Sequence, residues 1–399
     1  MNLPSQKTLN VYYSNLLKKQ FVGRLLYKNK QIFFEYDDIF IESKLELSPF
    51  KLPLEKNIII SKDRVFEGLF GVFNDSLPDG WGRLLLDRKL MKAGFNIRSL
   101  SPLDRLCFVG NHGMGALSYE PENQVKNLKL SNDLDEIDSE IQSTLNEKDF
   151  YIEELLLLGG SSGGARPKVL LHIDSEDWLI KFRSKVDPKD MSAIEYAYHQ
   201  MAQDAGLIVP KARLFPSRNG LGFFGVKRFD RNGDERIHMH TIAGLLHADH
   251  REPSLDYENI LKATLYLTKN IEQCEIQFRN AVFNVLSHNK DDHSKNFSFL
   301  MDSSGIWTVS PAYDLTFSFG PGGEHSTMIM GEGKSPTKEH LLKLSSVCNI
   351  KQDKALEIIY QVSKATEKWK KFAIDCGVSK LQTKNIDKSL SFIRKNLGF

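Results

Sequence analysis

The sequence predicts an α+β protein, with a β-rich amino-terminal region followed by a mainly helical carboxyl-terminal region. Three observations lead to this fold class. Aromatic and β-branched runs separated by turn residues fill about the first 120 residues. From about Tyr257 onward, apolar residues recur with the helical period. The length of 399 residues is enough for two or three domains that each bury a core.

Composition excludes some classes of protein. The 53 Lys and Arg residues nearly balance the 51 Asp and Glu residues, which argues against a uniformly basic nucleic-acid binder. Apolar residues make up 41% of the chain, which argues against wholesale disorder. The 4 cysteines are far apart in sequence, and no apolar run approaches the roughly 18 residues of a membrane span. We therefore expect a soluble, cytoplasmic protein with reduced thiols and no membrane partner.

The first region begins with three strand-like runs, LNVYYSN, FVGRLLYKN and QIFFEYDD, which favour a meander. A turn at Pro78–Gly80 then introduces a helix whose apolar face includes Leu86 and Leu90. The polar stretch from about residue 120 to 149 indicates a linker or a solvated helix.

A glycine-rich loop, GGSSGGARPK, leads into a strand, a turn and the short apolar strand WLIKF. A helical pattern follows and ends at Gly206, which is placed to cap it. Ser192 and Glu195 near its start match the S-x-x-E pattern of a capping box. Two further strands, LIVPKARLF and FFGVKRF, precede the helical region.

The most informative stretch is HNKDDHSKN, His288 to Asn296, between an apolar helix and a strand. Phosphoryl transfer uses a carboxylate to orient a hydroxyl nucleophile and a nearby amide oxygen to bind Mg²⁺, roles that Asp291 and Asn296 could fill. A hairpin after Asn296 would return a second carboxylate, Asp314 of PAYD, to the same place. A D-x-x-x-x-N pattern alone is common, and such polar residues are often loop caps, Asp292 and His293 included.

Upstream features strengthen the phosphoryl-transfer interpretation. The glycine-rich loop could wrap phosphates with its backbone amides, although it lacks Walker A spacing and could be a flexible turn. Lys181 in WLIKF either extends from an edge strand or reaches phosphate oxygens, and Glu195 could pair with it. The backbone of VKRFD, Val226 to Asp230, would lie at a hinge facing an adenine. The order of these parts is that of a two-lobed kinase.

These motifs make the chain resemble the HipA family of serine/threonine kinases, the toxin components of HipBA-type toxin–antitoxin systems. PLDRLCFVGNHGMGALSYEP resembles the end of the family's N-terminal subdomain, and GARPKVLL resembles its nucleotide loop. FGVKRFDR resembles its hinge, and NKDDHSKNFSFL with SPAYDL resembles its catalytic and metal-binding motifs. The resemblance covers nearly the whole chain. Lys227, where relatives are commonly acidic, departs from the pattern, and PDGWG at Pro78–Gly82 is typical of one branch.

The resemblance implies a two-lobed, protein-kinase-like fold. We place a β-rich N-terminal subdomain at residues 1–120, a linker or helix at 121–150, a kinase N-lobe at 151–232 and a helical C-lobe at 233–399. It also implies Asp291 as the catalytic aspartate and Asn296 with Asp314 as the Mg²⁺ ligands. Ser161 or its neighbour Ser162 would be autophosphorylated. The nucleotide-binding candidates are Gly163, Gly164, Ala165, Lys168, Lys181, Lys227, Phe229, His293 and Lys295.

The implied activity is ATP- and Mg²⁺-dependent phosphorylation of a Ser or Thr hydroxyl, on the protein itself and on a translation-related protein such as an aminoacyl-tRNA synthetase. The implied partner is a HipB-type DNA-binding antitoxin, which would give the chain an indirect association with DNA. Two alternatives stay open. One is a small-molecule kinase of the aminoglycoside-phosphotransferase type. The other is a catalytically weak binding subunit of a repressor complex. His238 and His240 lack a third ligand and are expected to be structural.

Overall fold

The computed structural model describes residues 6–15, 18–123, 132–146, 152–159, 164–220, 222–252 and 254–398. The chain forms two compact units. The first unit comprises Met1–Asp187, Lys227–His247 and Leu300–Ile306, and the second comprises Pro188–Val226, Ala248–Phe299 and Trp307–Phe399. The domain limits expected from the sequence stay predictions. Among the described residues, no helix has the length and apolar character needed to cross a membrane.

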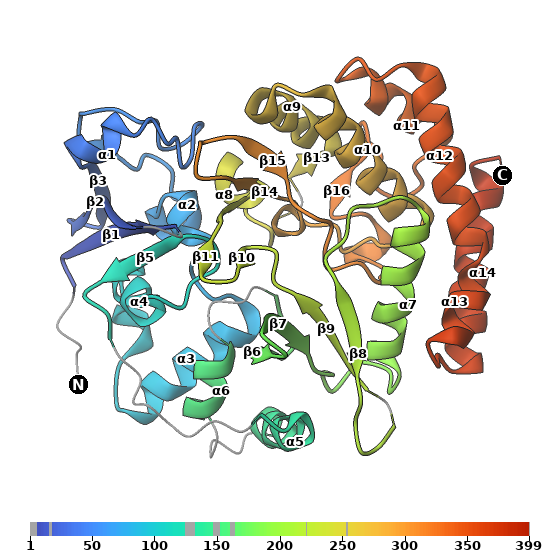
Figure 1. Cartoon of the computed structure of the whole chain (residues 1–399), viewed down its shortest axis with the longest axis horizontal. Helices are drawn as coiled ribbons and strands as arrows, with labels where there is room; N and C mark the ends of the chain where they lie inside the picture. The colour runs from blue at the N-terminus through green and yellow to red at the C-terminus, as the bar shows by residue number, and fades with distance from the viewer. Residues whose placement is uncertain are drawn as a thin grey trace. The chain divides into compact units, whose positions relative to one another are not determined.

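The first unit is built around a five-stranded antiparallel sheet in the order β4-β3-β2-β1-β5, drawn in blue and teal in Figure 1. Alternation buries Leu9, Val11 and Tyr13 on one face of β1. Gly23 on β2 allows close strand approach, because a Cβ there would lie 2.2 Å from the carbonyl oxygen of Glu35. The strands are β1 Thr8–Ser14, β2 Lys19–Lys28, β3 Gln31–Tyr36, β4 Ile59–Ile60 and β5 Leu117–Glu120.

Short helices complete the amino-terminal part of the first unit. The turn at Pro78–Gly80 introduces α3, as expected, and α3 buries Leu86 and Leu90. The polar stretch after residue 120 contains the helix α5, which buries Ile137 and Ile141. The helices are α1 Asp38–Glu42, α2 Gly71–Asn74, α3 Gly80–Lys92, α4 Pro102–Val109, α5 Leu134–Leu145 and α6 Ile152–Gly159, with 3₁₀ turns at Val65–Gly68 and Ile97–Ser99.

The rest of the first unit contains the β6–β7 and β10–β11 hairpins, the strand β12, which pairs with β14, and one short helix. Asp174 and Ser175 both have positive φ, of 52° and 61°, which closes the expected turn between β6 and β7. These elements are β6 Lys168–Ile173, β7 Glu176–Lys181, β10 Arg231–Asn232, β11 Glu235–Arg236, β12 His238–Thr241 and α8 Ile242–Leu246.

The two histidines of β12 lie in the core of the first unit. His240 Nδ1 lies 2.6 Å from Asp75 Oδ2, and its Nε2 lies 2.9 Å from Ser48 Oγ. His238 Nε2 lies 2.9 Å from the carbonyl oxygen of Leu47. Ser48 and His240 are both fully buried, so this serine–histidine–aspartate arrangement gives no substrate access. It connects β12 to the end of α2 and to the loop that carries Ser48. No group of metal-binding side chains is found among the described residues. The hydrogen bonds of both histidines lie in the buried core, which is compatible with the structural role expected for them.

The second unit is mainly helical. Its helices are α7 Met191–Asp204, α9 Tyr257–Thr268, α10 Ile271–Leu286, α11 Lys338–Ser346, α12 Gln352–Glu367, α13 Trp369–Asp375 and α14 Lys380–Asn396, with 3₁₀ turns at Ser294–Asn296 and Pro321–Gly323. Its strands are β8 Ala212–Phe215, β9 Phe223–Lys227, β13 Leu255–Asp256, β14 Ser298–Met301, β15 Trp307–Val309 and β16 Thr327–Met328, of which β9 and β14 each cross into residues assigned to the first unit. The α+β class expected from the sequence is confirmed.

Helix α10 is central to the second unit. It contacts α9, α12, α11 and α14, and its face of Phe278, Ala281, Val282 and Val285 is buried. Figure 1 shows α7 beside the red helices α12 to α14, and α7 packs on α12 and α13. Tyr198 of α7, for example, meets the ring of Trp369 edge-on at 5.2 Å.

The expected capping box at the start of α7 is wrong. The helix begins at Met191, its N-cap is Asp190, and no side chain caps it. Ser192 therefore lies inside the helix, where its hydroxyl cannot take the N-cap position. Glu195 is buried, with only 2% of its surface exposed, so it is a core carboxylate and not a helix cap.

Candidate active site

The loop after α10 carries the candidate catalytic aspartate. Helix α10 ends at Leu286, and His288 adopts a φ of 57°, so the chain turns away from the helix axis. The ring nitrogen Nδ1 of His288 lies 2.9 Å from the carbonyl oxygen of Ser318, which fixes this turn. Asp291 follows with an exposed side chain. A carboxylate in this position is accessible to a hydroxyl group and can accept its proton.

Asn296 is held beside Asp291. It ends the 3₁₀ turn Ser294–Asn296, and its amide nitrogen Nδ2 donates to the backbone oxygen of Asp291 at 2.7 Å. Because the amide nitrogen donates in this way, the amide oxygen Oδ1 is identified as the acceptor end of the side chain. Mg²⁺ prefers such oxygen ligands. The five-residue spacing therefore brings these two residues together.

Asp314 follows the β14–β15 hairpin. The hydroxyl of Tyr313 donates to the backbone oxygen of Lys295, so the residues that precede Asp314 and Asn296 meet at the base of the hairpin. Asp314 has a φ of 58°. Non-glycine residues seldom adopt this left-handed conformation, and aspartate is among those that tolerate it. The hairpin thus returns a second carboxylate toward the loop that carries Asn296.

Asp292, next to Asp291, is fully buried. Its carboxylate accepts a hydrogen bond from the hydroxyl of Tyr257 at 2.8 Å and lies 2.8 Å from Nδ1 of His325. Backbone amides of Ser326 and Thr327 donate to the other oxygen at 2.9 Å and 3.3 Å. Burial, reinforced by the charge of Asp292, raises the pKa of Tyr257, which keeps its hydroxyl a donor. Asp292 therefore organises the interior of the loop.

A small polar cavity of about 10 Å³ lies against Asn296 and is lined by α10 amides and by Tyr313. Three buried amide atoms on its wall have no hydrogen-bond partner among the described residues: Gln277 Nε2, Asn280 Oδ1 and Asn289 Oδ1. The volume matches one water molecule, which would satisfy these atoms. The wall behind the metal-ligand candidate therefore carries polar groups that a bound water could reach.

In the first unit, the β6–β7 hairpin carries two buried lysines. Lys168 and Lys181 are cross-strand partners, with 5% and 8% of their surfaces exposed. The ammonium group of Lys168 faces Gly164, because a Cβ on that glycine would lie 2.7 Å from it. Lys181 does not extend into solvent as an edge-strand lysine would. Two ammonium groups on neighbouring strands make this hairpin attractive to anions.

The glycine-rich loop is described only from Gly164 onward. Ser161, Ser162 and Gly163 lie outside the described residues, and Ala165 is exposed. The described end of the loop is bound by the PDGWG turn, because the backbone amide of Gly164 donates to the carboxylate of Asp79. The amide of Trp81 in turn donates to the backbone oxygen of Gly164 at 3.1 Å. The PDGWG motif thus positions the end of the nucleotide-loop candidate.

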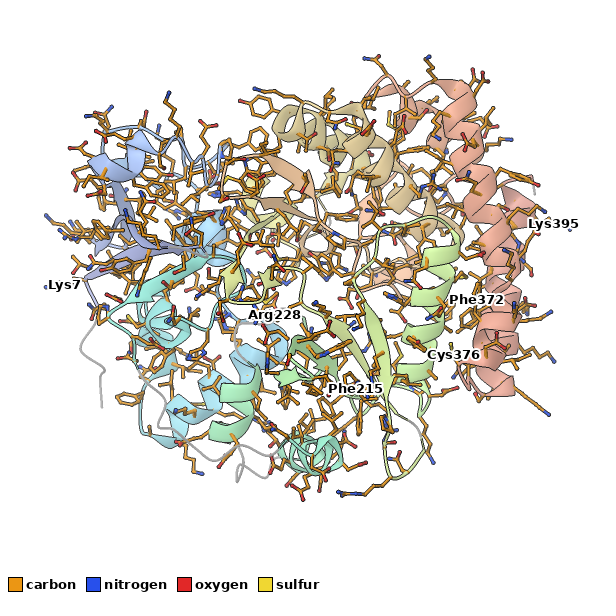
Figure 2. The ribbon with its side chains drawn as sticks, viewed as in Figure 1. Lys7, Phe215, Arg228, Phe372, Cys376 and Lys395 are labelled. Carbon is orange, nitrogen blue, oxygen red and sulfur yellow. The ribbon has the colours of Figure 1, made fainter. Side chains whose placement is uncertain are left out.

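The hinge candidate is fixed by a buried ion cluster. Arg228, labelled in Figure 2, binds both oxygens of Asp230 at 2.9 Å and 2.7 Å, and Arg231 adds a bond of 2.8 Å. The amide of Gly115 donates to the same carboxylate at 2.8 Å. Burial alone would raise the pKa of Asp230, but the two arginines outweigh burial and lower it to about 2.

The remaining candidates have simpler surroundings. The side chain of Lys227 binds Glu176 at 3.1 Å, so its ammonium group is directed toward β7. Phe229 and Lys295 are half-buried. His293 precedes the 3₁₀ turn and packs on His250, with ring centroids 5.5 Å apart.

The positioning roles of Asp79 and Asp292 were not predicted from the sequence. Both residues lie in motifs that the sequence shows, but the groups that they bind lie far away in the chain.

Comparison with known proteins identifies the family of this chain. Residues 160–369 match the family model of the HipA-like C-terminal domain, and residues 10–120 match that of the HipA N-terminal domain. Because the first of these matches alone spans more than half of the chain, the chain belongs to the HipA family. The resemblance seen in its motifs is confirmed.

Two curated relatives are similar over part of the chain. A Haemophilus influenzae protein named "Putative kinase" is 29% identical over 181 residues, which cover 39% of this chain and 52% of that protein. A Sinorhizobium fredii protein named "Putative kinase Y4dM" is 27% identical over 151 residues, which cover 35% of this chain and 36% of that protein. The match thus spans about half of the first relative and about a third of the second.

A solved structure shows the same fold. The chain aligns with a structure described as the Shewanella oneidensis toxin–antitoxin system of HipA, HipB and operator DNA, with a TM-score of 0.72 and 16% identity. The alignment covers 98% of both chains. The protein therefore has a HipA-like fold, and the fold class expected from the sequence is confirmed.

Proposed function

We propose that this chain is an ATP- and Mg²⁺-dependent serine/threonine protein kinase of HipA type. The observation that carries the proposal is the hydrogen bond from Asn296 to the backbone of Asp291. It sets an amide oxygen beside an exposed carboxylate, at the base of the hairpin that leads to Asp314. Membership of the HipA family supports the same activity.

Each residue has a defined role in the proposed reaction. Asp291 orients the acceptor hydroxyl and accepts its proton while the γ-phosphoryl group moves from ATP to the hydroxyl oxygen, which leaves ADP. Asn296 and Asp314 would hold Mg²⁺, whose charge offsets that of the phosphate oxygens. Lys168 and Lys181 would bind phosphates, and the hinge backbone from Lys227 to Phe229 would face adenine.

The residues present fit this nucleotide and this metal. The buried lysines of the β6–β7 hairpin supply positive charge beside the glycine-rich loop. The oriented amide of Asn296 and the carboxylate of Asp314 are both oxygen ligands, which Mg²⁺ prefers over nitrogen or sulfur. Glu195 is a further carboxylate proposed to pair with Lys181, and its burial on α7 is compatible with an ion-pair role.

We further propose that the chain is the toxin of a toxin–antitoxin module. It would bind a HipB-type DNA-binding antitoxin and phosphorylate a translation-related protein such as an aminoacyl-tRNA synthetase. Autophosphorylation at Ser161 or Ser162 would place a phosphate in the glycine-rich loop, where it would compete with the phosphates of ATP. The fold shared with a HipA found with HipB and operator DNA supports this partner.

Incubation of the purified chain with γ-labelled ATP and bacterial lysate tests the activity. Label in protein supports a protein kinase, whereas label only in added aminoglycosides supports a small-molecule kinase. Binding of Mg·ATP without turnover supports a binding subunit instead. Purification from the native source, followed by phosphoproteomics, identifies the antitoxin and the substrate together.

A further inference from the structure

The segment after Asp314 is bound along the catalytic-loop candidate. The backbone amide of Lys290 donates to the oxygen of Ser318 at 3.3 Å, and the amide of Ser326 donates to the oxygen of Lys290 at 3.1 Å. The ammonium group of Lys290 binds the backbone oxygens of Gly323 and Lys334 at 2.7 Å and 3.1 Å. Lys290 therefore attaches the catalytic-loop candidate to residues 318–334 at several points.

The same segment is also attached to the start of α9. Strand β16 pairs in parallel with β13. Asp256, the N-cap of α9, accepts hydrogen bonds from the backbone amides of Met330 at 3.1 Å and Gly331 at 2.6 Å. Both ends of residues 318–331 are thus held on the second unit. Phe319, with 66% of its surface exposed, is accessible to a bound protein.

The carboxylate of Asp292 lies where these attachments converge. It is fully buried and bound to the side chain of His325, which is also buried, and to the backbone amides of Ser326 and Thr327. The hydroxyl of Thr327 donates to the backbone oxygen of Asp292. A buried carboxylate is stable only while such donors surround it, so the segment and the loop must keep one arrangement.

A chain of side chains connects this carboxylate to the scaffold. Asn289 Nδ2 donates to Asn284 Oδ1 at 2.9 Å, and Asn284 Nδ2 donates to the hydroxyl of Tyr257 at 2.9 Å. Tyr257 then donates to Asp292. Helices α9 and α10 therefore set the position of Asp292, and Asp292 sets the position of the adjacent residue Asp291.

We propose that Asp292 is a positioning residue, which through His325 locks residues 318–331 to the catalytic loop. This lock would hold the acceptor protein in a fixed position relative to Asp291. The proposal rests on the kinase activity proposed above. Outer groups of this kind typically change activity about 10- to 100-fold when they are removed. We therefore expect Asp292→Asn and His325→Leu to lower kcat by about that factor.

The test uses the full-length chain with γ-labelled ATP, and label in the chain and in lysate protein as the readouts. His325→Gln is the conservative variant, because its amide can still donate to Asp292, and we expect it to restore most of the kcat lost in His325→Leu. Binding of a fluorescent ATP analogue measures the fraction of folded protein. Hydrogen exchange at residues 318–331, which needs no activity, should be faster in Asp292→Asn and His325→Leu.

The outcomes separate the two ideas. Loss of kcat at full nucleotide binding, with faster exchange and with rescue by glutamine, supports the proposal. A wild-type kcat in both variants overturns it, and so does a fall only in proportion to nucleotide binding, which is a purely structural effect. If the wild-type chain labels nothing, the kinase activity itself fails, and unchanged exchange in the variants would overturn the locking role separately.

Discussion

The ion cluster at the hinge candidate makes a quantitative prediction. Asp230 is fully buried and accepts hydrogen bonds from Arg228, Arg231 and the amide of Gly115. In Asp230→Asn, the guanidinium groups of Arg228 and Arg231 lose their counter-charge. The new amide N–H group also faces the N–H donors of these arginines, with which it cannot form hydrogen bonds. Removal of one partner from a buried ion pair costs about 3–5 kcal/mol. We expect the free energy of unfolding of the first unit to fall by that amount.

Urea denaturation followed by tryptophan fluorescence measures this loss, because Trp81 and Trp178 are buried in the first unit. With an m-value of about 2 kcal/mol per molar urea, the midpoint should fall by about 1.5–2.5 M. The matched control is Glu176→Gln, which removes the partly exposed partner of Lys227 at 3.1 Å. Glu176→Gln should lower the free energy of unfolding by only about 0–1 kcal/mol.

The pH dependence of the same carboxylate has a definite sign. Its folded pKa of about 2 lies below its usual 3.8. The stabilisation is therefore complete above pH 3.8 and is lost as the pH falls through about 2. The proposed stabilisation by the cluster is wrong if the free energy of unfolding of Asp230→Asn lies within about 1 kcal/mol of the wild-type value. It is also wrong if the urea midpoint of Asp230→Asn is no lower than that of Glu176→Gln.

Three further predictions concern other positions. Burial lowers the pKa of His238 to about 4 from 6.5, so the free energy of unfolding of the wild type should fall by about 1.6 kcal/mol between pH 6.5 and pH 5 through this residue. In His238→Gln this part of the pH dependence should be missing from the urea midpoints. Gly80→Ala should weaken binding of a fluorescent ATP analogue, because its Cβ would lie 2.4 Å from the backbone oxygen of Gly164; equal affinity would contradict this. Asn296→Ala should raise the Mg²⁺ concentration for half-maximal phosphorylation about tenfold or more, and an unchanged Mg²⁺ titration would exclude a ligand role.

Local sequence patterns predicted the features that depend on neighbours in the chain. The β6–β7 hairpin, the helix after Pro78–Gly80 and the loop before Asn296 follow from turn residues and apolar periodicity. The five-residue spacing of Asp291 and Asn296 also predicted their proximity, since a short loop cannot separate them.

Features that depend on distant contacts could not be derived in this way. Ser192 and Glu195 matched a capping box with Ser192 as the N-cap, but α7 begins at Met191, two residues before the start that this box requires. Asp292 looked like an ordinary loop residue, since its partner His325 lies 33 residues away in the chain. Asp79 binds the amide of Gly164, 85 residues away. No local pattern contains such pairings.

Asp291 is the residue proposed to support phosphoryl transfer to protein. The most direct measurement compares wild type, Asp291→Asn and the control Asp302→Asn, which changes an exposed carboxylate at the tip of the β14–β15 hairpin. We predict that wild type and Asp302→Asn transfer label from γ-labelled ATP to protein. Asp291→Asn should bind ATP normally but lose about 100- to 10,000-fold in kcat. Full phosphorylation of protein by Asp291→Asn would contradict the catalytic role proposed for Asp291.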